Sequence, residues 1–461
     1  MGDPAGSNKL DRMASVTRLN RRAVRILGQN PSSFTLQGMS VVLIAGTNTY
    51  LIMPPCDWNF EDRTTLLPAM LVDTGDAIED YVPYLEQVLR GNLSMLDEGN
   101  GPVRIALTDM YVDPLTPSIL THWHHDHVGG VPFVLRMLDK LRREAAPHVQ
   151  IPVPRVHKHP EPTTDASFFE RVRYVPSGAF VPAPQKHGLE SVMWPLQDQM
   201  SVSVVDPENP RLTTTLRALY TPGHAADHIM FLLEEDHILL TGDNVLGRGS
   251  TVFEDLILYM HSLQRVLDVL SSRSATPLGV VGTPISGMAG ENVLFPAHGE
   301  VIPKGKDTLR RYIQHRIDRE EQLIALFACR PGQKTDVMQA IAYPEKLVAL
   351  LRRGQAPRHV WTLRQFVSAL YENYALKMYP AVARVLLLHL QKLATSLDQL
   401  KAAPFPTRRA VPSMEWHAHG PLVQCMKLPK YQSSCVPWPE LPRSEDEWRE
   451  VWDLPWRLIA T

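Results

Sequence analysis

The sequence predicts an α/β protein in which strands are layered with helices, followed by a separate helical unit. Over the first three-fifths of the chain, short β-branched runs alternate with helical patterns. From residue 304 onward, apolar residues recur at steps of three and four, which is typical of packed helices. The 461 residues are 44% hydrophobic and 21% charged, a globular composition that excludes a wholly disordered, collagen-like or long coiled-coil chain.

The expected strands and helices follow one another along the chain. The predicted strands cover residues 41–44, 49–52, 70–72, 105–108, 118–120, 214–220, 229–233, 238–241 and 293–295, and an amphipathic helix over about 256–270 precedes the last of them. The predicted C-terminal helices cover residues 308–327, 336–351, 361–374 and 380–394. Residues 143–162, rich in proline, histidine and charge, are interpreted as a surface insertion. Residues 403–461 hold nine prolines and five tryptophans, and we expect this tail to lie on the body of the protein.

The sequence contains few signals that indicate a cellular compartment. No stretch approaches the roughly 18–20 uninterrupted apolar residues of a membrane-spanning helix. The N-terminus lacks the residue succession of a secretory signal. The cysteines lie far apart and form no CxxC pair, which indicates a reducing compartment and gives no support for a cysteine zinc site: Cys56, Cys329, Cys425 and Cys435. We expect an intracellular, cytoplasmic protein, with the mitochondrial matrix as the alternative because four arginines lie between residues 18 and 25.

The most specific motif follows the predicted strand at 118–120. It reads THWHHDHVGG from residue 121 and offers four candidate ligands: His122, His124, Asp126 and His127. Imidazole and carboxylate are both good ligands for zinc and similar ions. On a strand-to-loop turn that runs into a helix, these side chains can diverge to serve two adjacent metals. Taken alone, the motif also fits an exposed histidine-rich loop that binds metal only adventitiously.

Three further segments favour a metal site. TPGH ends at His224, TGD at Asp243 and PAHG contains His298, and each follows an apolar strand through small or turn residues. Individually, Asp243 could cap a helix and His298 could be a surface histidine. Together and in this order, the segments predict a metal site built on loops at strand ends.

This ordered set of motifs resembles the metallo-β-lactamase superfamily over about residues 17–330. The resemblance implies an αββα sandwich, in which two sheets pack face to face between helices. It implies that His122, His124 and His224 hold one metal, that Asp126, His127 and His298 hold the other, that Asp243 bridges the two, and that Asp73 supports the metal loop from behind. All the ligand positions carry the expected residue types.

The resemblance also implies a mechanism. Two zinc ions, with iron or manganese as alternatives, share a water whose pKa falls towards ~7, and the resulting hydroxide is the nucleophile. We assign catalytic roles to Asp126 and Asp243 in addition to metal binding. His228 is either a supporting or substrate-contacting residue or a packing residue, and His125 is interpreted as a pocket-wall residue rather than a ligand.

A closer resemblance is to the β-lactamase-like protein 2 family of the glyoxalase II-like group. It is carried by VRILGQNP at 24–31, TLQG at 35–38, TNTYL at 47–51, GDNVLG at 242–247 and TVFEDL at 251–256. That family includes endoribonucleases acting on single-stranded RNA and fungal thioesterases that release polyketides from acyl carrier proteins. Its pattern implies a hydrolase domain at 17–303, a helical winged-helix-like domain at 304–419 and a Pro/Trp-rich tail at 420–461. Residues 39–46, 54–67 and 150–184 are insertions relative to it and bear on substrate access.

Charge is divided unevenly along the chain. Residues 301–410 hold 19 Lys+Arg and 8 Asp+Glu, whereas the remainder holds 28 and 41, so the net charge of −2 combines +11 with −13. A basic module beside a hydrolytic site could gather a phosphate backbone or meet an acidic carrier protein. The alternative is that the basic helices simply dock on the acidic body.

The sequence therefore predicts a dinuclear zinc hydrolase. The leading hypothesis is an endoribonuclease-type phosphodiesterase acting on single-stranded RNA. The alternatives are a thioesterase acting on acyl-carrier-protein, CoA or glutathione thioesters, and a non-catalytic metal-stabilised binding module. Neither the pocket residues nor the oligomeric state can be predicted from one sequence.

Overall fold

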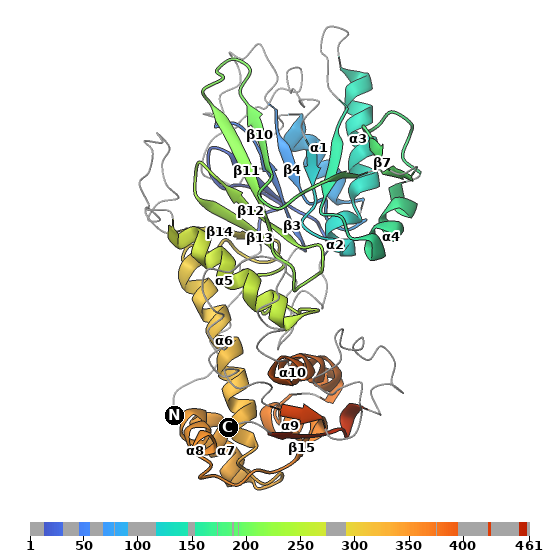
Figure 1. The fold of residues 1–461 in the computed structure, drawn as a ribbon. Helices are drawn as coiled ribbons and strands as arrows, with labels where there is room; N and C mark the ends of the chain where they lie inside the picture. Colours follow the sequence, from blue (N-terminus) through green and yellow to red (C-terminus); the bar gives the residue numbers. More distant parts are fainter. Residues whose placement is uncertain are drawn as a thin grey trace, which may run out of the picture. The chain divides into compact units, whose positions relative to one another are not determined.

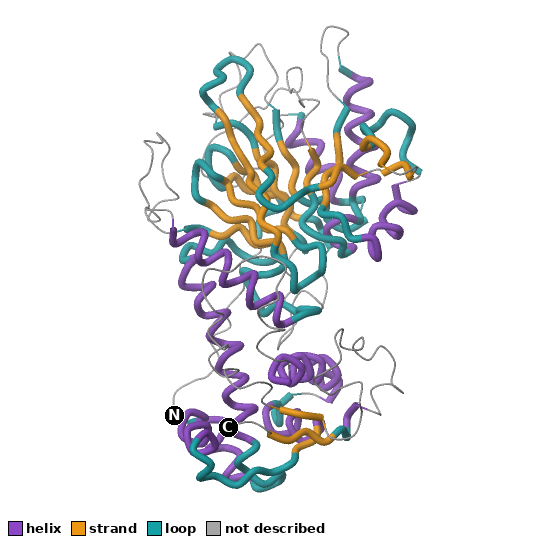
Figure 2. The backbone as a smooth tube through the Cα atoms, viewed as in Figure 1, coloured by secondary structure: helices purple, strands orange, loops and turns teal. Residues whose placement is uncertain are grey.

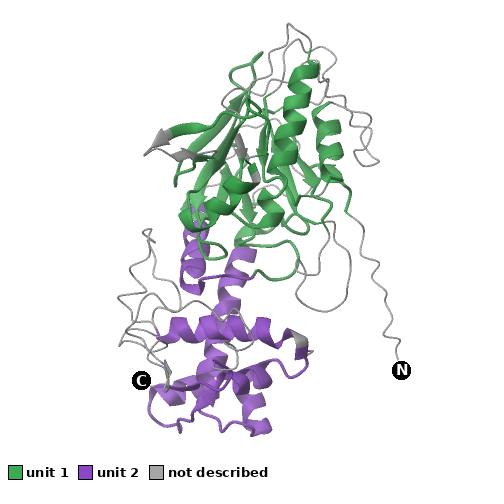
Figure 3. Cartoon of the chain, turned by 90° about the vertical axis from the view of Figure 1, so that its right-hand side faces the viewer, with its two compact units in different colours: residues 1–251, 270–306 green, residues 252–269, 307–461 purple. Residues whose placement is uncertain are grey.

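The computed structural model describes residues 13–30, 46–55, 68–77, 79–90, 117–145, 153–172, 174–186, 189–191, 193–272, 292–374, 376–394, 423–425 and 451–458 (Figure 1). The chain forms two compact units, residues 1–251 with 270–306 and residues 252–269 with 307–461 (Figure 3). Strands are concentrated in the first unit and helices in the second (Figure 2). The domain limits predicted after residues 303 and 419 stay predictions.

The first unit contains two main sheets. The seven-stranded sheet has the order β1 (Val16–Arg18), β2 (Ala23–Leu27), β3 (Asn48–Ile52), β4 (Met70–Val72), β5 (Pro117–Ile119), β6 (Arg155–Lys158) and β9 (Met193–Pro195). The five-stranded sheet has the order β10 (Ser201–Val205), β11 (Thr213–Tyr220), β12 (Ile229–Leu233), β13 (Ile238–Gly242) and β14 (Leu294–Pro296). A small hairpin, β7 (Ala183–Lys186) and β8 (Leu189–Ser191), accompanies them.

Side chains that alternate between the two faces of each strand explain why the two sheets pack together. Tyr50 and Ile52 of β3 pack with residues of the second sheet such as Phe231 and Phe295, and the rings of Tyr50 and Phe295 stack 5.4 Å apart. Leu51, between them, lies in a different cluster with residues of two helices. Because successive side chains of a strand point to opposite faces, one strand serves both layers.

Helices cover the outer face of the first sheet. They are α1 (Tyr81–Leu89), α2 (His125–Val128), α3 (Val131–Glu144) and α4 (Pro162–Val172). Leu85 of α1 and Val134 of α3 pack with Val24 and Ile26 of β2, which are fully buried. The short helix α2 carries part of the histidine motif, so the predicted passage from strand through loop to helix is confirmed.

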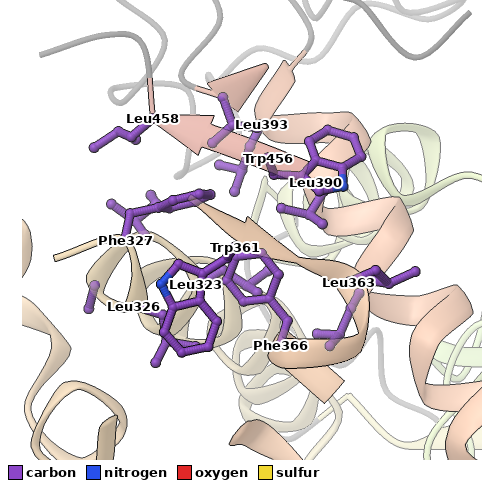
Figure 4. Close-up of a cluster of buried hydrophobic side chains, with 14 of the residues drawn as sticks. Leu323, Leu326, Phe327, Trp361, Leu363, Phe366, Leu390, Leu393, Trp456 and Leu458 are labelled. Atoms are coloured by element: carbon purple, nitrogen blue, oxygen red, sulfur yellow. The ribbon is translucent and has the colours of Figure 1, made fainter. Parts of the chain in front are cut away.

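The second unit has a core of its own. Its helices are α5 (Leu256–Ser272) and α6 (Gly305–Leu326), which belong to it for most of their length, with α7 (Lys334–Ala342), α8 (Pro344–Arg352), α9 (Leu363–Leu370), η2 (Leu376–Met378) and α10 (Tyr379–Ala394). A small sheet has the order β15 (Trp361–Thr362), β17 (Pro455–Leu458) and β16 (Val423–Cys425). Figure 4 shows Trp361, Phe366 and Trp456 in this core, where both tryptophans are buried. Part of the predicted tail is therefore a strand of the second unit.

Most predicted strands and helices inside the described ranges are confirmed within two residues, and α6 begins three residues before its predicted start at residue 308. The predicted strands at 41–44 and 105–108 and the segment TLQG at 35–38 lie outside the described residues. The inserted residues 39–45 and 56–67 also lie outside them. None of the helices among the described residues is long and apolar enough to cross a membrane.

Two predicted helices were wrong in detail. The helix predicted at 336–351 is two helices that meet at Tyr343 and Pro344, since the residue before a proline is disfavoured in helical conformation. The helix predicted at 361–374 begins only at Leu363 and ends at Leu370, after the strand β15. Thr362 closes its first turn through a capping box with Gln365.

The interpretation of residues 143–162 as a surface insertion was also wrong in part. Residues 155–158 form β6, which pairs in parallel with β5 on one side and β9 on the other. Val156 and Lys158 on this strand are buried. Prolines on both sides of the strand, and three basic residues within it, hid its apolar character in the sequence.

Acid is expected to destabilise the second unit through a buried cluster of Glu320, His389 and Lys392. Both Glu320 carboxylate oxygens lie 2.8 Å from Lys392 Nζ, and His389 Nδ1 lies 3.4 Å from Oε1. Burial lowers the pKa of His389 to about 4. For Glu320, burial acts upward, but Lys392 and His389 lower the pKa to about 2.

Acid lowers the free energy of unfolding through both groups, because the unfolded chain binds more protons than the folded one. Stability is lost as the pH falls through 6.5 towards 4 for His389, and below 4.5 towards 2 for Glu320. We expect amide hydrogen exchange in α6 and α10 to report a loss on the order of 2 kcal/mol between pH 7 and pH 4. A His389→Leu variant should lose less stability over this range, and an unchanged pH profile in that variant would contradict the assignment.

Candidate metal centre

The residues predicted to bind metal stand on loops and a helix start that follow strands of both sheets. His122 and His124 follow β5, with Asp126 and His127 on α2, while His224 lies between β11 and β12, Asp243 follows β13 and His298 follows β14. The structure brings them together in two groups whose ligand atoms lie within 4.8 Å of one another. We call His122, His124 and His224 the three-histidine set, and Asp126, His127 and His298 the carboxylate set. Asp243 belongs to both groups.

Three imidazole nitrogens converge in the three-histidine set. His122 Nε2 lies 2.9 Å from His124 Nδ1 and 3.2 Å from His224 Nε2, and the third side of the triangle measures 2.9 Å. Tetrahedral zinc with Zn–N bonds of ~2.0–2.1 Å places its nitrogen ligands about 3.3 Å apart. The triangle is therefore close to the size that a single zinc ion requires.

The outer ring nitrogens of this set are engaged elsewhere. His122 Nδ1 lies 3.0 Å from the hydroxyl of Thr121, and His224 Nδ1 lies 3.3 Å from the hydroxyl of Thr251. With the proton on the outer nitrogen, each ring presents a lone pair to the centre of the triangle.

Carboxylate oxygens and imidazoles meet in the carboxylate set. His298 Nε2 lies 3.2 Å from Asp126 Oδ2 and 3.2 Å from Asp243 Oδ1. His127 Nε2 lies 3.4 Å from Asp243 Oδ1 and 3.5 Å from Asp126 Oδ2. His127 Nε2 and Asp243 Oδ1 are both buried and make no hydrogen bond within the described part of the chain. Buried atoms that carry a lone pair and lack a partner fit a metal ion as that partner.

The two sets share the carboxylate of Asp243. Its Oδ1 faces His127 and His298, whereas its Oδ2 lies 3.6 Å from His224 Nε2. Gly242 precedes it with a φ of +50°, and a Cβ there would lie only 2.5 Å from His228 Nε2. Only glycine fits both this backbone conformation and this space, so the turn that presents Asp243 depends on Gly242.

Asp73 supports the motif from behind, as the resemblance implies. It adopts a φ of +60°, and its carboxylate accepts hydrogen bonds from the backbone N–H and the hydroxyl of Thr121, each at 2.8 Å. His127 Nδ1 donates to Asp73 Oδ2 at 2.8 Å. Because a carboxylate only accepts, this bond places a proton on Nδ1 and directs Nε2 of His127 into the centre.

His228 is buried behind the centre rather than inside it. Its Nε2 accepts from the backbone N–H of Asp243 at 3.2 Å, and its Nδ1 lies 3.1 Å from the hydroxyl of Thr221. The contact with the Asp243 backbone supports the interpretation of His228 as a supporting residue. His125 lies outside both ligand groups, about half exposed, and pairs with Asp76.

Electrostatics differ between the two sets. Burial lowers the pKa of His122 far below its usual range and that of His124 to about 3, so these two imidazoles are neutral and reject protons. Burial acts downward on His298 as well, but Asp243 and Asp126 raise its pKa to about 9. The carboxylate set therefore attracts positive charge, and a divalent cation meets this demand.

Sequence reasoning assigned no role to Thr47, which lies in the TNTYL segment. Its hydroxyl donates to Asp126 Oδ2 at 3.1 Å, and its backbone forms a bridge with His298. Asn30 accepts from the Thr47 backbone N–H at 2.8 Å and fixes the segment. The position of TNTYL at the start of β3 was the available signal, because a polar residue at a strand end faces the same edge as the other ligands.

Comparison with known proteins identifies the family to which this fold belongs. The family model described as metallo-beta-lactamase superfamily matches residues 68–281. A beta-lactamase-like protein 2 homolog of Drosophila melanogaster is 29% identical over 359 residues, 75% of this chain and 85% of the relative. The homolog of Caenorhabditis elegans is 30% identical over 316 residues, 68% and 74% of the two chains. An atrochrysone carboxyl ACP thioesterase of Aspergillus novofumigatus is 26% identical over 325 residues, 70% and 68% of the two chains.

The fold and the paired histidine and aspartate groups define a metal-dependent hydrolase. The chain belongs to the metallo-β-lactamase superfamily, and its relatives are beta-lactamase-like protein 2 homologs and fungal lactamase-like proteins. The predicted family, the fold class with its C-terminal helical region and the predicted enzyme class are thereby confirmed.

Proposed function

We propose that the chain is a dinuclear zinc hydrolase in which the three-histidine set and the carboxylate set each hold one ion. The observation that carries this proposal is the carboxylate of Asp243, whose two oxygens face different sets. Such a pair of ions supplies an activated water and stabilises the negative charge that develops on the substrate. Iron and manganese are the alternative ions, because histidine and aspartate accept all three metals.

The chain's own residues fix this geometry before any substrate arrives. Asp73 and Thr121 hold the imidazole of His127, and Thr47 holds the carboxylate of Asp126. The His228 ring holds the backbone at Asp243. Because these supports are buried hydrogen bonds, the ligands are preorganised and little reorganisation accompanies catalysis. We assign catalytic roles to Asp126 and Asp243, which are the carboxylates that face the shared space between the two sets.

As the substrate we propose single-stranded RNA, cleaved at a phosphodiester. This choice of substrate is supported by the surplus of positively charged residues over 301–410, some of which are exposed in the second unit. Arg352, Arg353 and Arg358 are exposed, whereas Arg316 is buried against the rings of Phe253 and Tyr259. Exposed arginines near the end of α8, such as Arg353, can contact phosphate groups.

The second candidate is hydrolysis of acyl thioesters on carrier protein, CoA or glutathione. It is favoured by the relative from Aspergillus novofumigatus, which is an atrochrysone carboxyl ACP thioesterase. The reading as a non-catalytic binding module is set aside, because the chain belongs to a superfamily of hydrolases and both ligand groups are complete.

Parallel assays on both substrates test the proposal. Zinc-loaded protein is expected to cleave labelled single-stranded RNA, and Asp126→Ala should abolish this cleavage. A double variant, Arg353→Glu with Arg358→Glu, should raise the KM for RNA at least tenfold with kcat little changed, because it removes two exposed positive charges that would bind phosphate. Thiol release from an acyl thioester without RNA cleavage would contradict the RNA assignment and favour the second candidate. Absence of both activities in zinc-loaded protein would overturn the hydrolase proposal.

A further inference from the structure

A buried lysine lies beside the metal centre and has no part in the function described so far. Lys158 ends β6, and its side chain is fully buried. Its ammonium donates to Asp165 Oδ1 of α4 at 2.8 Å and to the backbone carbonyl of His159 at 3.0 Å, and it forms a second ion pair with Asp227. A charged group is rarely buried to this degree unless paired, so two carboxylates around one ammonium mark a built arrangement.

Asp227 connects this lysine to the ligand loops. It is fully buried and lies in the β11–β12 loop, three residues after His224. Burial raises the pKa of this carboxylate, whereas the Lys158 ammonium and the backbone N–H of Trp123, the residue between His122 and His124, act to lower it. One carboxylate thus stands between the two chain segments that provide the three-histidine set.

Other contacts join these two segments to each other. The backbone N–H of Ile229 donates to the carbonyl of Thr121 at 2.9 Å. The hydroxyl of Tyr220 donates to the carbonyl of Ala226 at 2.9 Å, which closes the loop that carries His224. Asp165, by contrast, accepts from the backbone N–H of Glu161 at 2.9 Å and serves the start of α4.

We propose that Lys158 and Asp227 form a positioning pair for the three-histidine set, and that Asp165 serves the start of α4 and takes no part in metal binding. This inference rests on the proposed function. The pair anchors the His224 loop and the Trp123 segment to the end of β6, so that the three imidazole nitrogens stay at the spacing of one ion. The carboxylate set is supported separately by Asp73 and Thr47, so the pair should act on one metal site and not on the other.

The two carboxylates around Lys158 offer a matched pair of variants. Asp227→Asn and Asp165→Asn each leave one ammonium with one carboxylate, so the buried charges are balanced in both variants and both are expected to fold. A merely structural role for Lys158 predicts that the two variants behave alike. A positioning role predicts that only Asp227→Asn changes metal binding.

Titration of the metal-free full chain with Zn²⁺ in a calorimeter measures this difference, and Co²⁺ absorption identifies the affected site. The wild-type protein is expected to bind two ions. In Asp227→Asn, the affinity for one ion should fall about 10- to 100-fold, with the other within threefold of the wild type, as expected for loss of a group that orients ligands. Asp165→Asn should bind both ions like the wild type. If Asp227→Asn folds poorly by circular dichroism, Asp227→Ser takes its place.

The outcomes separate the inference from the function on which it rests. Unchanged affinity for both ions in Asp227→Asn, or equal losses in Asp227→Asn and Asp165→Asn, would overturn the positioning role alone. A wild-type protein that binds no zinc would overturn the proposed dinuclear centre, and the inference with it.

Discussion

Replacing Asp243 with alanine is expected to lower kcat/KM for the hydrolysed substrate by about 10³-fold or more and to reduce bound zinc from two ions to one or none. The reason is that Oδ1 faces His127 and His298 while Oδ2 faces His224, so a single truncation removes a ligand from both sets. It also removes one of the carboxylates that balance the positive charge on the buried imidazole rings of His127 and His298. Steady-state kinetics and elemental analysis of the purified variant measure the two effects.

Asp139→Ala provides the control for Asp243→Ala. Asp139 is a buried aspartate on α3 that pairs with Arg142 and Arg143, away from the ligand groups. Its loss should destabilise the first unit without changing the zinc content. An Asp243→Ala protein that keeps two ions and at least a tenth of the activity would contradict the shared role of this carboxylate.

The second large effect is expected at Asp73, where alanine should lower the free energy of unfolding by about 2–4 kcal/mol. Alanine leaves the buried N–H of Thr121 without its acceptor, frees the ring of His127, and must adopt a φ of +60°. Zinc affinity of the carboxylate set should fall about 10- to 100-fold in the same variant. Urea unfolding and zinc titration measure these losses.

Three substitutions at this position separate the causes. Glycine relieves the backbone strain but not the lost hydrogen bonds, so Asp73→Gly should be about 1 kcal/mol more stable than Asp73→Ala. Asparagine tolerates the same backbone conformation and keeps one acceptor, so Asp73→Asn should be the most stable of the three. Equal stability of all three variants would show that Asp73 contributes only through its charge.

The candidate ligands could be found from the sequence because each segment that carries them comes after a strand. A strand of apolar residues, a turn and one ligand-type side chain form a local pattern, as in ILLTGD ending at Asp243. Residues that hold the ligands in place from distant positions in the sequence leave no such local pattern. Thr47 contacts Asp126 across 79 positions, and Lys158 meets Asp227 across 69. Nothing near Lys158 in the sequence indicates that its charge is buried.

The elements that were predicted wrongly have a similar origin. The break at Pro344 is a local proline effect that competes with an otherwise continuous helical periodicity. The strand β17 near the C-terminus exists because Trp456 packs in the second unit and pairs with Trp361, a partner 95 positions earlier. Pairing over such a separation depends on the assembled core, and composition alone predicts only that the tail is not free.

The arrangement of the centre at the ends of strands from both sheets has a thermodynamic consequence. The ligand atoms span positions 122 to 298, and they come together only when the sandwich is closed. An ion that binds the closed form and not the open one adds RT ln(1 + [L]/Kd) to its stability, about 2.7 kcal/mol at one hundred times the Kd. The stability of the first unit is therefore linked to the free metal concentration around it. Metal supply then governs how long the folded protein lasts as well as how fast it works.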